Sequence, residues 1–163
     1  MLLTAAACSQ FSVRERHDPA ADFTRLHTWA WHPRTQEPWD RRLTRDRLDV
    51  IIQDGIQSEL TAKGYAKVDD DPDFRVNFHV AVGARQALQS DPNTYGYYLG
   101  AWGMEVYAYD EGSLFVDVID ARTNTLMWRG VVSAVARPGL SLDERQARFK
   151  TGVEKVMAQF PPR

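Results

Sequence analysis

The amino-acid sequence predicts a two-layer α+β domain, in which a mostly antiparallel sheet of about four to five strands has two helices packed on one face. Two long amphipathic stretches and several shorter stretches of alternating apolar and polar residues favour this class. The predicted strands and helices do not alternate regularly, as they would in a parallel βαβ fold. With 163 residues, the chain has the length of one domain.

The composition indicates a globular protein without a nucleic-acid partner. Hydrophobic residues make up 44% of the chain and charged residues 26%, and the formal net charge is −2. The basic residues are spread along the sequence, whereas nucleic-acid-binding proteins usually gather them in one stripe. No apolar run approaches the roughly 20 residues of a transmembrane helix. We therefore expect a globular body that does not span a membrane.

The start of the chain resembles the end of a lipoprotein signal peptide. The only cysteine is Cys8, and the run LTAAAC resembles the bacterial lipobox, where small residues precede a cysteine that receives a lipid. We interpret residues 1–7 as a remnant of the signal peptide and expect lipidation of Cys8. Residues 8–22 are polar and predict a tether that leads into a single domain at residues 23–162.

The first half of that domain predicts a strand, a helix and a second strand. Residues 23–31 (FTRLHTWAW) are rich in aromatic and β-branched residues, which favours a strand. Residues 43–65 predict a helix that ends at Gly64, because apolar side chains recur every three or four residues. This stripe consists of Leu48, Ile51, Ile52, Ile56 and Leu60. Residues 74–82 (FRVNFHVAV) alternate strictly and predict a strand with one buried face.

The second half predicts a hairpin followed by a helix. Residues 113–120 and 125–136 form the hairpin strands, and residues 104–109 predict a further short strand. The final helix covers residues 141–160, and its Ser141 and Glu144 side chains fit a capping box, in which each side chain satisfies a free backbone N–H group.

The hairpin turn contains residues with predicted structural roles. We expect Asp120 to accept hydrogen bonds from backbone amides around Thr123, as aspartates do in turns. Leu126 and Trp128 are expected on one face of the returning strand. Gly130 is expected to permit a bulge or a close backbone approach. We favour this structural interpretation over a catalytic one.

Five separated stretches resemble one protein family. They are DFTRLHTWAW, LTAKGY, PDFRVNFHV, EGSLFVDVIDARTNTLMWRG and FPP, in this order. Together they resemble the bacterial envelope lipoproteins that carry domain of unknown function 4136 (DUF4136), over about residues 22–162. The resemblance implies an exported lipoprotein with a lipidated cysteine, in agreement with the interpretation of Cys8. The family has no established activity, so the resemblance implies no catalytic residue.

Motifs for catalysis, metal binding and nucleotide binding do not stand out. His27 and His79 could meet on one sheet face, but a hydrogen-bonded or solvent-facing histidine is the commoner case. The acidic run at residues 69–73 lacks the glycine and closing glutamate of an EF-hand loop. A G-x-S-x-G elbow and a glycine-rich phosphate loop are also lacking. We expect no cofactor, no metal and no enzymatic activity.

One aromatic stretch suggests a contact surface. The segment TYGYYLGAWGMEVYAY gathers tyrosine and tryptophan side chains, which are enriched at binding surfaces and membrane interfaces. Two interpretations stay open: the rings cover the sheet, or they contact a protein partner, a glycan or a lipid surface. The residues are Tyr95, Tyr97, Tyr98, Trp102, Tyr107 and Tyr109.

These observations lead to one main functional hypothesis and two alternatives. We expect a non-enzymatic envelope lipoprotein that is anchored through the lipid on Cys8 and acts as an interaction or assembly module for an envelope protein partner. Ser9 follows the cysteine in place of an inner-membrane retention aspartate, which favours the periplasmic side of the outer membrane. The alternatives are a periplasmic small-ligand-binding domain with a tyrosine-rimmed pocket between sheet and helices, and a hydrolase of envelope polymers.

Overall fold

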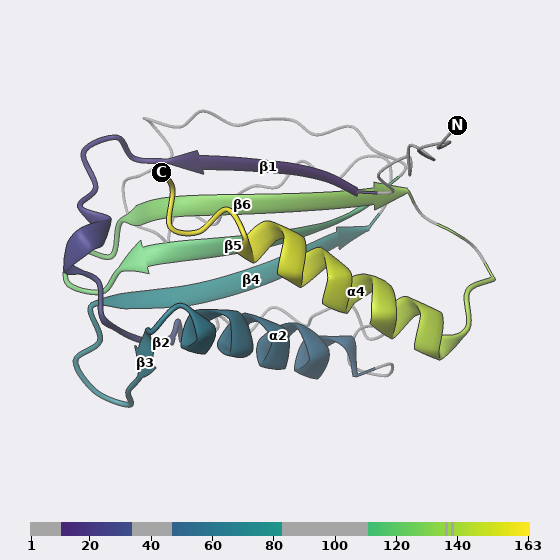
Figure 1. The fold of residues 1–163 in the computed structure, drawn as a ribbon, viewed down its shortest axis with the longest axis horizontal. Coiled ribbons are helices and arrows are strands. Elements are labelled where there is room, and N and C mark those ends of the chain that lie inside the picture. Colours follow the sequence, from purple (N-terminus) through teal and green to yellow (C-terminus); the bar gives the residue numbers. More distant parts are fainter. Residues whose placement is uncertain (1–10, 34–46, 83–110, 136, 138) are drawn as a thin grey trace, which may run out of the picture.

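In the residues that the structure describes, a six-stranded sheet carries two α-helices on one face (Figure 1). This computed structural model describes residues 11–33, 47–82, 111–135, 137 and 139–163. The elements are β1 (Phe11–His17), a short 3-10 helix η1 (Phe23–Arg25), β2 (Thr28–Trp31), α2 (Leu48–Ala62), β3 (Ala66–Lys67), β4 (Phe74–Val82), β5 (Glu111–Asp120), β6 (Leu126–Val135) and α4 (Leu142–Met157). Within these ranges, no helix has both the length and the hydropathy needed to cross a membrane.

The sheet is larger and less regular than the sequence predicts. Its strand order is β1-β6-β5-β4-β2-β3, so six strands replace the expected four to five. The long strands β1, β6, β5 and β4 pair in antiparallel fashion, but β2 is parallel to both β3 and β4. The α+β class and the two helices are confirmed. The strand number was wrong because the two edge strands carry almost no apolar signal.

The edge strand β1 corrects the prediction of a tether over residues 8–22. Phe11–His17 pairs with β6 along its whole length, from Phe11 opposite Ala134 to His17 opposite Trp128. Phe11 and Val13 pack against the core, while Ser12 and Arg14, which alternate with them, are exposed. Two inward apolar residues are enough to hold β1 on the sheet because backbone hydrogen bonds to β6 supply the remaining stabilisation.

Strand β2 begins later than predicted. Residues 23–25 form the 3-10 helix η1, which the Asp22 side chain caps by accepting from the backbone N–H of Thr24. Extended pairing begins only at Thr28. Asp73, just before β4, holds this junction by accepting from the backbone N–H groups of His27 and Thr28, each at 2.8 Å.

The core lies between the sheet and the two helices (Figure 1). Its largest fully buried side chains include Trp29, Trp128, Phe74, Phe78 and Phe160. The helices α2 and α4 also pack on each other, at a point where a Cβ on Gly55 would lie 3.0 Å from Val153. The two predicted helix boundaries are confirmed: Gly64 follows α2 with a φ of +89°, and Ser141 and Glu144 form the capping box of α4.

Candidate functional site

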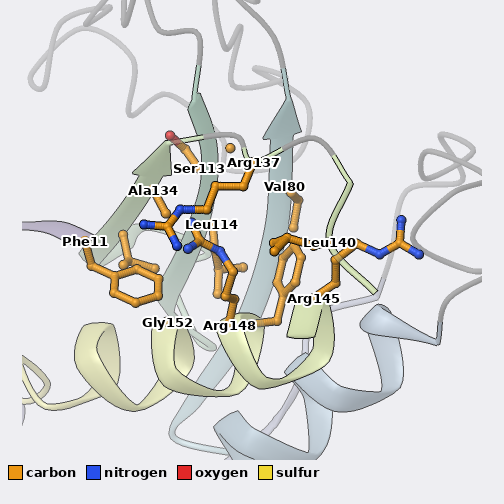
Figure 2. A pocket seen from close by; sticks show the side chains of 13 residues that line it. Phe11, Val80, Ser113, Leu114, Ala134, Arg137, Leu140, Arg145, Arg148 and Gly152 are labelled. Atoms are coloured by element: carbon orange, nitrogen blue, oxygen red, sulfur yellow. The ribbon is translucent and has the colours of Figure 1, made fainter. Parts of the chain in front are cut away.

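A pocket of about 230 Å³ lies between α4 and one end of the sheet (Figure 2). Four strands contribute to it because their antiparallel pairing brings the start of β1 and β5 to the same end as the finish of β4 and β6. The described residues that line it are Phe11, Val80, Gly112, Ser113, Leu114, Val132, Ala134, Arg137, Leu140, Arg145, Arg148, Phe149 and Gly152.

The floor of the pocket is apolar. Val80 lies opposite Leu114, and Leu114 lies opposite Val132, so one side chain from each of β4, β5 and β6 forms a row across the sheet. Phe149 of α4 packs against the same core from above. The position of Val80 in this row is what the alternation of β4 predicts for the helix-covered face.

Small residues leave the space open. A Cβ placed on Gly112 would meet no heavy atom within 4 Å, and its partner on β6 is Ala134. On α4, a Cβ on Gly152 would lie 3.6 Å from Val132 and 3.8 Å from Phe11, which is ordinary contact. The pocket therefore exists because Gly112, Ala134 and Gly152, next to the apolar floor, have no side chain or only a methyl group to fill the space.

Three arginines line the mouth of the pocket. Figure 2 shows Arg137 and Arg148 reaching over it beside Phe11, whereas Arg145 extends away. The guanidinium carbon of Arg148 lies 5.5 Å from the centroid of the Phe11 ring, a cation–π contact. Burial, followed by the positive charge of Arg137, lowers the pKa of Arg148 from its usual value. The mouth therefore carries two guanidinium groups beside Phe11.

Sequence reasoning did not identify this arginine-rimmed pocket. A signal for part of it is present in α4, where Arg145, Arg148, Phe149 and Gly152 follow helical spacing and so share one face. The remaining residues come from four separate strands and from the connection before α4. Their convergence depends on the tertiary structure.

Asp120 has its predicted structural role in the hairpin turn. Its Oδ1 accepts from the backbone N–H groups of Arg122 and Thr123, both at 2.9 Å, and Arg25 donates to its Oδ2. Burial alone would raise the pKa of Asp120, but the Thr123 hydrogen bond and the Arg25 contact outweigh it and lower the pKa below its usual value. These contacts stabilise the turn, and Thr123 also bonds Thr125 through its hydroxyl, at 2.6 Å.

Strand β6 differs from its prediction in the placement of Leu126. A register shift between Val118 and Ile119 places Trp128 opposite Val118 and Leu126 opposite Ile119. Trp128 is therefore in the main core, whereas Leu126 forms a separate small cluster with Ile119. The prediction of one shared face was wrong because a bulge inserts an extra residue and changes the alternation.

Gly130 permits the close approach that the sequence suggested. A Cβ on Gly130 would lie 2.3 Å from the ring of Trp128 and 2.5 Å from the side chain of Val156. The bulge itself lies elsewhere, between Val118 and Ile119. Gly130 and Trp128 are thus packing residues where α4 crosses β6.

The face of the sheet opposite the helices carries a polar group of side chains. Arg129, which is partly exposed, donates two hydrogen bonds to the fully buried carboxylate of Asp117. The Phe115 ring lies 6.0 Å from the guanidinium of Arg129. The ring of His79 stacks on Phe115 with a centroid distance of 4.6 Å. His79 keeps some exposed surface, yet burial lowers its pKa to about 4, against the opposing effect of Asp117.

The histidines do not converge on a metal site. The backbone of His27 is held by Asp73 ahead of β4, while His79 stacks on Phe115 further along that strand. In the part of the chain that the structure describes, no three metal-ligating side chains come together.

Two groups of predicted residues lie outside the described residues. Cys8 is one, and the aromatic group of Tyr95, Tyr97, Tyr98, Trp102, Tyr107 and Tyr109 is the other, together with the short strand predicted at residues 104–109. Lipidation and contact through the tyrosines therefore stay predictions.

Comparisons with known proteins identify a family and a shared fold. The family model described as domain of unknown function (DUF4136) matches residues 13–162. A PDZ domain protein from Parabacteroides distasonis aligns with a TM-score of 0.61 and 17% identity over 94% of this chain, which spans 37% of that chain. PelC from Paraburkholderia phytofirmans, solved as a dodecamer, aligns with a TM-score of 0.51 and 11% identity over 94% of this chain and 99% of that chain. These identities support the fold alone, and comparison with curated proteins finds no match.

Proposed function

The chain belongs to the DUF4136 family, and from this premise we propose that it is a non-enzymatic binding protein of the bacterial cell envelope whose pocket holds a small apolar chain. The observation that carries the proposal is the pocket between α4 and the sheet, with its apolar floor and its volume of about 230 Å³. Concave apolar sites with a few polar groups at the mouth are the usual form of ligand sites.

The size of the pocket limits what it can hold. Pockets that enclose drug-sized ligands measure roughly 300–1,000 Å³, and an engineered apolar cavity of about 150 Å³ binds benzene. A volume of about 230 Å³ lies between these values and suits one alkyl chain better than a fused ring system. Burial of each methylene group would contribute about 0.8 kcal/mol.

The position of the pocket also agrees with a membrane anchor at Cys8. Phe11 lines the pocket and follows Cys8 by three residues. An extended chain spans at most about 3.3–3.6 Å per residue, so about 11 Å of backbone separates the two residues at most. If Cys8 carries a lipid, the pocket lies close to the membrane surface, where alkyl chains are available.

Binding of octan-1-ol tests the proposal. We expect saturable binding by isothermal titration, and loss of binding in Gly112→Leu, because Gly112 lines the pocket and has free space at its Cβ. Ala147→Leu is the matched control, since it adds the same side chain at an exposed position of α4. Equal binding by Gly112→Leu and the control would contradict the proposal, as would the failure of the original protein to bind any eight-carbon alcohol, carboxylate or phosphate.

A further inference from the structure

The mouth of the pocket has the charge of an anion site. Three arginines line it, and no aspartate or glutamate stands among its described lining residues. Arg137 is exposed, and Arg148 is half-buried beside it at the end that Phe11 closes (Figure 2). Guanidinium groups offer forked donors that match the oxygens of a carboxylate or a phosphate, so such a pair can bind one anion from two sides.

The two arginines also come from independent elements. Arg148 is fixed on α4, whereas Arg137 belongs to the connection between β6 and that helix. Like charges repel, and the positive charge of Arg137, after burial, contributes to the lowered pKa of Arg148 on the same pocket. An anion bound between the two guanidinium groups would reduce this repulsion. This reduction would strengthen binding of the anion to the pocket.

Packing alone explains part of this arrangement. Arginine stems cover apolar surface, and Arg148 contacts the Phe11 ring. Lys155, seven residues further along α4, also approaches this ring, with its Nζ 5.9 Å from the centroid of Phe11. Lys155, however, does not line the pocket, so cover for Phe11 does not require two arginines at the mouth.

We propose that the ligand of the pocket is an anionic amphiphile, whose carboxylate or phosphate lies between Arg137 and Arg148 while its alkyl chain lies on the floor formed by Val80, Leu114 and Val132. This inference rests on the proposed function above, since it names the chemical class that the same pocket binds. If Cys8 carries the expected lipid, its closeness to Phe11 in the sequence makes the membrane the source of such a molecule.

Titration with matched eight-carbon probes tests the inference. The probes are octan-1-ol, octanoate and octyl phosphate, and inorganic phosphate serves as an anion without a chain. We expect at least one of the two anionic amphiphiles to bind about tenfold or more tightly than octan-1-ol, because charge-assisted hydrogen bonds add to burial of the chain. The comparison of octanoate with octyl phosphate tells which anion fits better. Inorganic phosphate is expected to bind far more weakly than octyl phosphate.

Two substitutions at the mouth identify the groups responsible. The double variant Arg137→Gln, Arg148→Gln is expected to lose the preference for the anionic probes and to keep the binding of octan-1-ol. Arg122→Gln is the control, because Arg122 is exposed in the hairpin turn outside the pocket. As a test on the unaltered protein, binding of the preferred anionic probe should weaken with rising salt while that of octan-1-ol does not.

The outcomes separate the two proposals. Equal affinity for the neutral and anionic probes would overturn the inference and leave the proposed function standing. Binding of no eight-carbon probe at all would overturn the proposed function and the inference with it. If inorganic phosphate bound tightly and octyl phosphate bound no more tightly, the proposal of an amphiphilic ligand would be wrong. This result would indicate a free anion as the ligand.

Discussion

Arg129 donates two hydrogen bonds to the Asp117 carboxylate across the β5–β6 pair, with Nε 2.6 Å from Oδ1 and Nη2 2.8 Å from Oδ2. The Asp117 side chain is fully buried, while that of Arg129 is 20% exposed. Two directly opposed strand residues thus form a two-point ion pair on the sheet face that α2 and α4 do not cover. Geometry of this kind is among the stronger charged contacts in proteins.

Removal of one partner from this pair should be costly. We expect Arg129→Met to reduce the free energy of unfolding by about 3–5 kcal/mol, because it leaves a buried carboxylate without its main counter-charge. The double variant Asp117→Leu, Arg129→Met should recover a large part of the loss. Urea unfolding of the two variants measures both effects, and Arg122→Met serves as the exposed control. A loss below about 1 kcal/mol in Arg129→Met would contradict this prediction.

Gly130→Ala should destabilise the protein through overcrowding. The added methyl group would overlap the Trp128 ring and the Val156 side chain, and overpacking of a core costs about 1–3 kcal/mol or more. Gly112→Ala is the matched control in the neighbouring strand, since its Cβ meets no atom within 4 Å. We expect Gly112→Ala to be neutral or slightly stabilising. Thermal unfolding of both variants checks the contrast, and similar melting temperatures would contradict it.

His79 should make the stability of the fold depend on pH. Burial holds its pKa at about 4 in the folded chain, below the ordinary value of 6.5. Between these two values the unfolded chain binds the proton and the folded chain does not, so the free energy of unfolding falls as the pH falls. The pH-dependent contribution of His79 to the free energy of unfolding is about 3 kcal/mol. It is fully present above pH 6.5 and is lost by about pH 4.

Urea unfolding at several pH values tests the role of His79. We expect His79→Gln to flatten the stability profile between pH 6.5 and pH 4 relative to the original protein. The carboxylates with lowered pKa, such as Asp73 and Asp120, lose their contribution at lower pH, and the variant retains this part. Parallel profiles for the variant and the original protein would show that another group is responsible.

Lipidation of Cys8 is a separate prediction from the lipobox. Expression from the full genomic locus in the native host should yield a membrane-bound species that begins at Cys8 and carries a diacylglycerol. Cys8→Ser should release the protein from the membrane fraction. Intact mass spectrometry measures the modification directly. An unmodified, soluble chain that retains Met1 would contradict the anchor.

The aromatic stretch provides a test of the interaction-module hypothesis. We expect the triple variant Tyr97→Ala, Tyr98→Ala, Trp102→Ala to lose capture of an envelope partner without a change in its circular dichroism spectrum. Capture is measured by affinity purification from solubilised envelopes of the native host, with the unaltered chain in parallel. Unchanged capture by the triple variant would exclude this stretch as the contact surface.

The sequence by itself determined the elements with strong periodicity. Strand β4 and the helices α2 and α4 were predicted because apolar residues recur along them at the strand or helix period. The β5–β6 hairpin was predicted from two strand-like runs on either side of the turn at residues 121–124. Local side-chain contacts were also predictable, as for Ser141 with Glu144 and for Asp120 with the Thr123 amide, since their partners lie within three residues. Family membership followed from the same segments.

Only the tertiary structure decided the edge strands and the pocket. Strand β1 has just two inward apolar residues, and its strand conformation depends on the free edge of β6 far along the chain. The pocket requires Phe11 and Arg148 to meet although 137 positions separate them (148 − 11). Its space results from small residues at Gly112, Ala134 and Gly152, whose effect depends on where α4 crosses the sheet. Periodicity reports which face of an element is buried, but the space between two elements depends on how they pack.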